Sequence, residues 1–502
     1  MSRPSCWPLA GIQVIDLSTE IAGPYCTKML VDAGAEVVKV ESPDGGDPLR
    51  CWTASGAPIA EGEDGALFQH LNASKRGVTL DLENGAGHEA LLDLAATADL
   101  VVESFHPGEL ARLDLGFDAL QARNPALSLI SISPWGSDGP WAERPATEFT
   151  LQAATGATAH RGLASREPVA AGGRIGEWIA GGFAAVGALF AWLSARNTGR
   201  GQHVDLSIFE AMLLSMTYYH ALSGQWREGK LPRAIEVPSV EPARDGWVGV
   251  CTITGQQWLD FCVLIGRPEL AEDERYLEGT FRSQQLEFIQ EIVHGWTRER
   301  TVDEIIELAS LMRIPVAPIG DGRNLPKMDH FARRGSFVEG PGGFLRPRPP
   351  YLLEKTALRP FGPAPKLGEH SGEVTAARKA TPPEKPGGGS GGALPLGGLR
   401  VVELSTFWAG PIAGWTLADM GADVVKVESI QRPDGMRFAG AIPTDRLWEW
   451  SPIFAGVNPG KRGVTLQLDS EEGMSLLERL IRSADVVTEN FSPRVMENFG
   501  LG

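Results

Sequence analysis

The sequence predicts an α/β protein with a Rossmann-like parallel sheet in a large domain, a smaller α+β domain, and a partial second copy of the large domain. Three observations support this fold class. Short apolar runs alternate with helical patterns, a long stretch near the start recurs near the end, and the balance of 43% hydrophobic and 22% charged residues is that of a globular chain. A length of 502 residues favours more than one core.

The opening reads as strand, loop, helix and strand, in the runs VIDLS, CTKMLVDAG and EVVKVES. Short apolar strands with a helix between them are typical of a right-handed parallel crossover covered on both faces. HEALLDLAATADLVVESF and PALSLISISPWG predict further crossovers. Ligands are therefore expected beyond the carboxyl ends of these strands. The first strand lacks a GxGxxG motif, which disfavours a dinucleotide, and Gly23-Pro24 is interpreted as a turn into the helix.

The most apolar stretch, WIAGGFAAVGALFAWL at 178–193, is shorter than the ~20 residues that span a bilayer. We therefore expect a helix buried on most sides and no membrane association. Its many glycines and alanines would let another backbone approach closely.

A repeat organises the chain. Residues 11–42 and 398–429 are identical at more than half of their positions without a gap, and KRGVTLDL and ADLVVESF recur as KRGVTLQL and ADVVTENF. We expect a large domain at 9–230, a small domain at 231–330, a return segment at 331–377, a flexible Pro/Gly-rich linker at 378–395, and the N-terminal part of a second copy at 396–502. The second copy contains too little to form its own small domain.

Charge and cysteine content limit the class of protein. A net charge of -17 would repel a polyphosphate backbone, so nucleic acid is not an expected partner. The five cysteines show no CxxC spacing, and the N-terminus lacks the pattern of a secretory signal. A cytoplasmic location is expected.

Five motifs together carry a resemblance: GIQVIDLS, NASKRGVTLDL, ADLVVESFHPGELARLDLGF, TGRGQHVDLSIFEA and GDGRNLPKMDHFARRG. The chain resembles the family III CoA-transferases, which include formyl-CoA transferase, carnitine CoA-transferase and α-methylacyl-CoA racemase. The resemblance implies acyl-CoA and a carboxylic acid as substrates, no tightly bound cofactor, no metal, and an interlocked dimer. Self-association or pairing of the two copies within one chain could supply that dimer.

The resemblance also assigns site residues. It places coenzyme A against Ser42, Lys75, Ser104, Phe105 and Arg112, and the acyl group near Ile21, Trp52 and Trp135. The chemistry fits, since Lys and Arg neutralise phosphates and an aromatic ring stacks on adenine. The alternatives are that the two cations are surface charges and that the aromatic residues belong to the core.

By the same resemblance, Glu177 occupies the position of the family's nucleophilic aspartate, in Glu177-Trp178-Ile179-Ala180-Gly181. A carboxylate can attack a thioester to give a mixed anhydride, then an enzyme–CoA thioester, and then pass CoA to another acid. Backbone N–H groups at a helix N-terminus are expected to stabilise the oxyanion. The alternative is that Glu177 only complements the helix dipole.

Two other functions stay open. The first copy could be a noncatalytic scaffold for chemistry in the second copy. Racemisation is less favoured, because Thr147 stands where the racemases have a histidine. The family's glycine-rich lid has no clear counterpart in REGKLPRAIEVPSVEPARDG. His70, His160 and His203 lack triad or metal spacing, and Cys26 and Cys51 lack a setting that would activate a thiolate.

Overall fold

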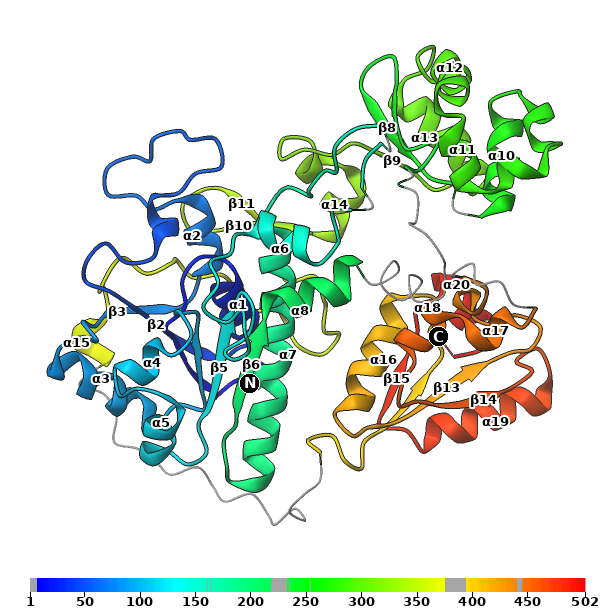
Figure 1. Ribbon diagram of the computed structural model, residues 1–502. Helices are drawn as coiled ribbons and strands as arrows, with labels where there is room; N and C mark the ends of the chain where they lie inside the picture. Colours follow the sequence, from blue (N-terminus) through cyan, green and yellow to red (C-terminus); the bar gives the residue numbers. More distant parts are fainter. Residues whose placement is uncertain are drawn as a thin grey trace. The chain divides into compact units, whose positions relative to one another are not determined.

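A computed structural model describes residues 7–159, 161–163, 165–217, 233, 235–252, 254–374, 394–439 and 445–501 (Figure 1). The chain divides into two compact units. The larger unit comprises 1–151, 174–230 and 351–502, and the smaller comprises 152–173 and 231–350. The smaller unit therefore extends past the predicted boundary at 330, and it includes an earlier segment that the sequence pattern assigned to the large domain.

The N-terminal part of the larger unit contains a six-stranded parallel sheet (Figure 1). Its order is β3-β2-β1-β4-β5-β6, and every neighbouring pair is parallel. This confirms the predicted Rossmann-like sheet. The strands are β1 (Gln13–Asp16), β2 (Glu36–Glu41), β3 (Arg76–Thr79), β4 (Leu100–Glu103), β5 (Ser128–Ser133) and β6 (His203–Ser207).

Helices cover both faces of this sheet. Val14 belongs to the core with α1 (Ala22–Asp32) and α7 (Ile175–Thr198), whereas the next residue, Ile15, belongs to the core with α3 (Gly85–Ala95). Successive strand side chains point to opposite faces, so a strand buried on both faces reads as an apolar run. Shorter helices complete this part: α2 (Ala66–Leu71), α4 (Glu109–Arg112), α5 (Phe117–Arg123), α6 (Glu148–Ala154) and α8 (Ile208–Met212), with the 3-10 turn η1 (Pro48–Cys51).

Helix α7 packs its small residues against α1. A Cβ atom on Gly181 would lie 2.5 Å from the backbone oxygen of Ala22, so only glycine permits this approach. Ala180 and Ala184 are also fully buried on this face. The expected close approach is confirmed, and Gly23 and Pro24, predicted as a turn, lie inside α1.

Helix α7 is buried on fewer sides than expected, and it is longer than the apolar stretch at 178–193. The helix has 24 residues, and the side chains on its outer side are partly exposed. Within the described ranges it is the one helix long and apolar enough to cross a membrane by length and composition. Its packing against α1 and its buried alanine face identify it here as a core helix, a class that passes the same test.

The smaller unit contains an antiparallel sheet, β7-β8-β9, and a helical layer around the buried Trp258 and Phe261. This is the expected α+β composition. Its elements are β7 (Val240–Pro242), β8 (Trp247–Val250), α10 (Gly255–Leu264), α11 (Gly279–Gln284), α12 (Leu286–Thr297), α13 (Val302–Leu311), β9 (Val316–Pro318), α14 (Asp329–Arg334), and the hairpin β10 (Phe337–Glu339) and β11 (Leu345–Pro347).

The C-terminal segment, residues 394–501, has its own parallel sheet in the order β14-β13-β12-β15. This matches the order β3-β2-β1-β4, and the pairing Arg400↔Asp423 corresponds to Gln13↔Glu36. Its main elements are β12 (Arg400–Glu403), α16 (Ala409–Asp419), β13 (Asp423–Glu428), β14 (Arg462–Thr465), α19 (Glu471–Arg482) and β15 (Val486–Thr488). The predicted linker at 378–395 lies, except for its last two residues, outside the described residues.

A buried ionic network holds the β1–α1 loop in the larger unit. Lys75 Nζ lies 2.9 Å from Asp16 Oδ2, and Lys39 Nζ lies 3.0 Å from Asp47 Oδ2, with all four side chains fully buried. Lys39 also donates to the backbone oxygen of Ser18. Asp47 accepts a hydrogen bond from the backbone N–H of the loop residue 20 at 3.3 Å. Such pairs satisfy charges that would otherwise be costly to bury.

The C-terminal segment has the same network with one compensated exchange. Lys461 Nζ lies 2.8 Å from Glu403, the counterpart of Asp16. The longer glutamate fits because Gly414 replaces Thr27, and a Cβ atom on Gly414 would lie 1.7 Å from Glu403 Oε2. The absence of a side chain at 414 thus leaves room for the longer side chain at 403.

Candidate active site

Glu177 is the central residue of the candidate site. It lies in the first turn of α7, is 9% exposed, and sits next to the β1–α1 loop at the carboxyl edge of the sheet. The loop reaches it through Glu20, which forms an ion pair with Arg174. The edge of the sheet and the start of α7 thus meet at one carboxylate.

Arg174 holds one oxygen of Glu177. The Arg174 Nε donates to Glu177 Oε1 at 2.7 Å, and the terminal nitrogen that pairs with Glu20 lies 2.6 Å from the same oxygen. Among the described residues no group donates to Oε2, and its residue retains slight exposure. One carboxylate oxygen is therefore fixed and the other is open.

The backbones on both sides of this ion pair are strained. Arg174 has φ 54° and Glu20 has φ 66°, both in the left-handed region that non-glycine residues rarely adopt. Such conformations cost on the order of 1–3 kcal/mol each and cluster at functional sites. The hydrogen bond to Asp47 holds the Glu20 backbone in this conformation.

Burial and charge oppose each other at Glu177. Burial raises the pKa of its carboxyl group above 4.5, while the adjacent Arg174 lowers it. The carboxylates of Glu20 and Glu148 add a smaller upward effect on this pKa. The ionised form that a nucleophile needs thus depends on Arg174.

The first-turn backbone N–H groups next to the carboxylate are already occupied. Gly176 donates to Glu148 Oε1 at 2.9 Å, and Glu177 donates to the backbone oxygen of Arg174 at 3.1 Å. Backbone N–H groups of the helix N-terminus were expected to be available to an oxyanion. In this structure the N–H groups of Gly176 and Glu177 form hydrogen bonds that stabilise the first turn of the helix. The guanidinium of Arg174 is the group that donates to the Glu177 carboxylate.

Three of the residues assigned to coenzyme A follow the carboxyl ends of strands. Ser42 is exposed after β2, and Ser104 and Phe105 follow β4. The Ser104 Oγ accepts a hydrogen bond from the backbone N–H of Thr19 at 3.0 Å, which joins two loops of this edge. Phe105 is half-buried against the α3 core. The fourth, Arg112, is exposed in α4 and pairs with two carboxylates.

The Lys75 ammonium is buried behind this edge, against Asp16 at the end of β1. Lys75 precedes β3, and its ammonium is fully enclosed. It donates to Asp16 Oδ2 at 2.9 Å, Thr27 Oγ1 at 2.7 Å and Asn72 Oδ1 at 2.8 Å, as well as to a backbone oxygen. Burial lowers the pKa of Lys75 to about 8, against the attraction of Asp16. This geometry supports a structural role and gives no support to phosphate binding.

The three residues assigned to the acyl group have different surroundings. Ile21 is buried in a small core with Phe68. Trp52 is 41% exposed and lines a hollow of about 550 Å³ together with the loop 53–63. The Trp135 indole N–H donates to the backbone oxygen of Arg144 at 2.9 Å, and its ring packs edge-on against Trp141. Only Trp52 therefore presents much of its surface to a ligand.

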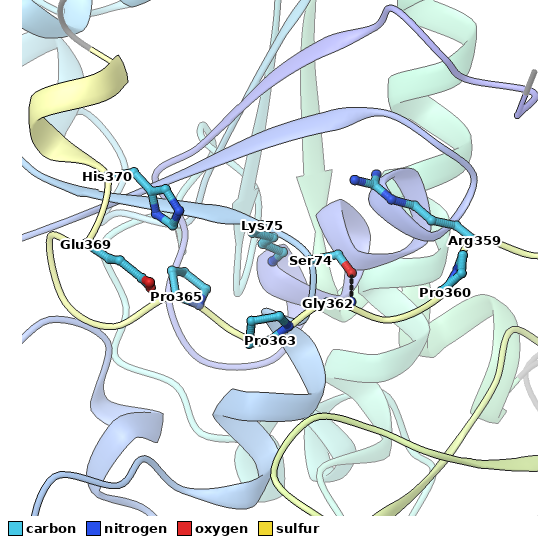
Figure 2. Close-up of a pocket in the computed structure, with 9 residues that line it drawn as sticks. All are labelled: Ser74, Lys75, Arg359, Pro360, Gly362, Pro363, Pro365, Glu369 and His370. Atoms are coloured by element: carbon cyan, nitrogen blue, oxygen red, sulfur yellow. Dashed lines mark hydrogen bonds between the residues drawn. The ribbon is translucent and has the colours of Figure 1, made fainter.

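A second cavity, of about 320 Å³, lies beneath the return segment (Figure 2). The backbone N–H of Gly362 donates to Ser74 Oγ at 2.6 Å, drawn as the dashed line. The His370 Nδ1 accepts from the N–H of Gly77 at 3.2 Å. These bonds fasten residues 359–370 alongside β3 in the same unit. The remaining lining residues are Lys75, Arg359, Pro360, Pro363, Pro365 and Glu369.

The other nucleophile and base candidates have structural surroundings. His203 Nε2 and Ser131 Oγ lie 2.9 Å apart, and burial lowers the pKa of His203. Burial raises the pKa of the Cys26 thiol far above its ordinary value. His160 lies outside the described residues. Within the part of the chain that the structure describes, no group of three His, Cys, Asp or Glu side chains could hold a metal ion.

Sequence reasoning missed Arg174 and Glu20. Arg174 precedes the carboxylate by three positions, a spacing at which side chains on a helix meet, so it carried a usable signal. Glu20 carried none, because only the folding of the sheet brings the β1–α1 loop to α7.

A buried carboxylate at the start of a helix, beside the carboxyl edge of a parallel sheet, is a group that can act chemically as a nucleophile in an α/β protein. Residues 9–371 and 396–502 match the family described as CoA-transferase family III. The chain belongs to this family and is a CoA-transferase.

Curated relatives support this assignment. The chain is 30% identical over 394 residues to the succinate–glutarate CoA-transferase of Agrobacterium fabrum, covering 75% of this chain and 98% of that protein. It is 32% identical to the alpha subunit of the succinyl-CoA–L-malate CoA-transferase of Chloroflexus aurantiacus, covering 73% and 88%. The crystal structure of a CAIB/BAIF family protein from Brucella suis superimposes with a TM-score of 0.66 at 28% identity, covering 74% and 99%.

Proposed function

We propose that this chain moves CoA from an acyl-CoA thioester to a carboxylic acid with Glu177 as the nucleophile. Glu177 Oε2 attacks the thioester carbon and releases CoA thiolate, leaving a mixed anhydride. The thiolate then attacks Glu177 Cδ, which releases the donor acid and leaves an enzyme–CoA thioester. The acceptor acid repeats these steps in reverse. The observation that carries the proposal is the buried carboxylate with one fixed and one open oxygen.

The donor is proposed to be the CoA thioester of a short dicarboxylic acid. Support comes from two relatives whose names specify succinate, glutarate or L-malate as substrates, at 30% and 32% identity. Ser42, Ser104, Phe105 and Arg112 are proposed to contact coenzyme A, since the first three lie at the edge where parallel sheets bind ligands. Trp52 and Trp135 are proposed to line the acyl site.

The chain is further proposed to be a tandem fusion. The matching strand orders and the matching ionic networks of the larger unit and the C-terminal segment support an origin by duplication. Pairing through self-association or between the two copies is part of this proposal, and light scattering of the purified chain tests it. The cytoplasmic location stays a prediction.

Trapping the intermediate tests the proposal. The purified chain is incubated with succinyl-CoA and then reduced with borohydride, and peptides are examined by mass spectrometry. Modification of the peptide that contains Glu177 is expected, together with loss of transfer in Glu177→Gln. Glu89→Gln, an exposed carboxylate on α3, is the matched control and should retain activity.

Three outcomes contradict the proposal. An active preparation with an unmodified Glu177 would exclude the covalent route. Full turnover by Glu177→Ala would instead favour the reading in which the first copy is a scaffold. Deuterium uptake at the acyl α-carbon from heavy water, without transfer, would indicate a racemase.

A further inference from the structure

The contacts between Arg174 and Glu177 are asymmetric, and charge neutralisation of the carboxylate alone does not explain this. Two of its nitrogens lie within 2.7 Å of a single atom, Glu177 Oε1, and none of its bonds reaches Oε2. An arginine that only neutralised the carboxylate would commonly contact both oxygens in a fork. Because of this asymmetry, the two carboxylate oxygens differ chemically: Arg174 contacts Oε1 and leaves Oε2 without a contact.

The consequence appears in the second step of the proposed reaction. Once Oε2 carries the acyl group, Oε1 is the carbonyl oxygen of the anhydride on the enzyme side. The CoA thiolate forms a C–S bond to Cδ, and negative charge moves onto Oε1 in the tetrahedral intermediate. When the electron pair on Oε1 re-forms the Cδ–Oε1 double bond, the Cδ–Oε2 bond breaks. The donor acid then leaves as a carboxylate with the electron pair of that bond. Donors aimed at Oε1 therefore stabilise this intermediate.

We infer that Arg174 is the oxyanion-stabilising residue for attack of CoA on Glu177, and that Glu20 is the positioning residue that orients it. This inference rests on the proposed function of Glu177. Two backbone donors of the first turn, the N–H groups of Gly176 and Glu177, are already bonded to other oxygens.

Glu20 fixes the guanidinium from the opposite side. Its carboxylate pairs with the nitrogen that also contacts Glu177, so the guanidinium lies between two carboxylates from different elements. The Glu20 backbone is held by Asp47 of the buried ionic network. A donor that is already oriented before the reaction needs little reorganisation when charge develops. The left-handed backbone of Arg174 fits this arrangement.

The C-terminal segment lacks this arrangement. Phe407 occupies the position of Glu20, with the same left-handed φ of 66°, and its backbone N–H donates to Asp434 at 3.0 Å. The loop conformation is thus the same without the carboxylate. The left-handed backbone therefore belongs to the loop, while the ion pair is specific to the first sheet.

Arg174→Gln and Arg174→Lys test the inference. Removal of an oxyanion donor typically lowers kcat by about 100- to 1000-fold. The kcat of Arg174→Gln should therefore be lower than that of the parent chain by about 100- to 1000-fold, and its KM for succinyl-CoA should stay within about threefold of the parent value. Arg174→Lys retains the charge but loses the Nε–H donor to Oε1, so its kcat should lie between that of Arg174→Gln and that of the parent chain. Arg123→Gln removes an exposed arginine paired with Asp93 and should leave kcat unchanged.

Rapid quenching separates the two chemical steps. With succinyl-CoA alone, Arg174→Gln should form the borohydride-reducible Glu177–CoA thioester at least about 50-fold more slowly than the parent chain, as follows from its loss of the donor. The acid limb of its kcat/KM profile should move to higher pH, because Arg174 no longer favours the ionised carboxylate. Glu20→Gln should lower kcat by a smaller factor than Arg174→Gln does. We expect the Glu20→Gln variant to fold even if Arg174→Gln does not.

The outcomes distinguish this inference from the proposed function. If Glu177→Gln is inactive while Arg174→Gln and Glu20→Gln retain kcat within threefold of the parent chain, Glu177 is the nucleophile and the inference about Arg174 is wrong. If Glu177→Gln is active, the proposed function itself fails. If Arg174→Gln does not fold, the other two variants decide. The inference is wrong if Arg174→Lys and Glu20→Gln both have a kcat within threefold of the parent chain.

Discussion

Replacement of Lys75 by Met distinguishes a structural lysine from a phosphate-binding one. The Lys75 ammonium has four oxygen partners and no exposed surface. Methionine has a similar length and no charge, so it would leave the Asp16 carboxylate buried without this cation. Removal of one partner of a buried ion pair typically costs about 3–5 kcal/mol of unfolding free energy. We expect a loss of this size.

Guanidinium unfolding of the full chain, followed by tryptophan fluorescence, measures the loss. Hydrogen exchange of the peptide at 13–41 locates the loss of stability, because the chain has two compact units that need not unfold together. Lys355→Met, at an exposed position of the same unit, is the control and should change stability by less than about 0.5 kcal/mol. A stability change below about 1 kcal/mol, combined with a clear rise in KM for acyl-CoA, would refute the structural role and favour a phosphate contact.

Two further predictions concern the same networks. In the C-terminal segment, Gly414→Ala should destabilise by about 1–3 kcal/mol, because the new Cβ would lie 1.7 Å from Glu403 Oε2. The double variant Glu403→Asp with Gly414→Thr should recover most of the loss that Gly414→Thr causes alone, and strict additivity in an unfolding double-mutant cycle would contradict the compensation. Asp16 supplies the pH prediction: burial opposes its ionisation, but Lys39 and Lys75 outweigh burial and hold its pKa well below 3.8. A carboxyl group with a lowered pKa in the folded state stabilises the fold above pH 3.8, and this stabilisation is lost as the pH falls below that value. The unfolding free energy of the larger unit should therefore decline below pH 3.8. Asp16→Asn should make this decline with pH less steep.

The sequence alone determined the sheet and its place in a family. Apolar runs such as those of β1 and β2 predict strands buried on both faces, because side chains alternate between faces and helices cover both. The repeat at 398–429 likewise predicted a second sheet, since similar sequences bury the same positions. The candidate role of Glu177 followed from the family resemblance of the stretch at 177–181, which is local in the sequence.

Tertiary structure decided which charges meet. Lys75 looked like a surface or phosphate-binding cation, but the pairing of β3 beside β2 directs its ammonium to Asp16 in the interior. Glu20 and Arg174 are separated by 154 positions and meet only because the carboxyl edge of the sheet lies beside the start of α7. Periodicity reports the environment of a residue within its own element, whereas an ion pair between elements depends on how those elements pack. The fold class could therefore be determined from the sequence, and the electrostatic surroundings of Glu177 could be determined only from the folded chain.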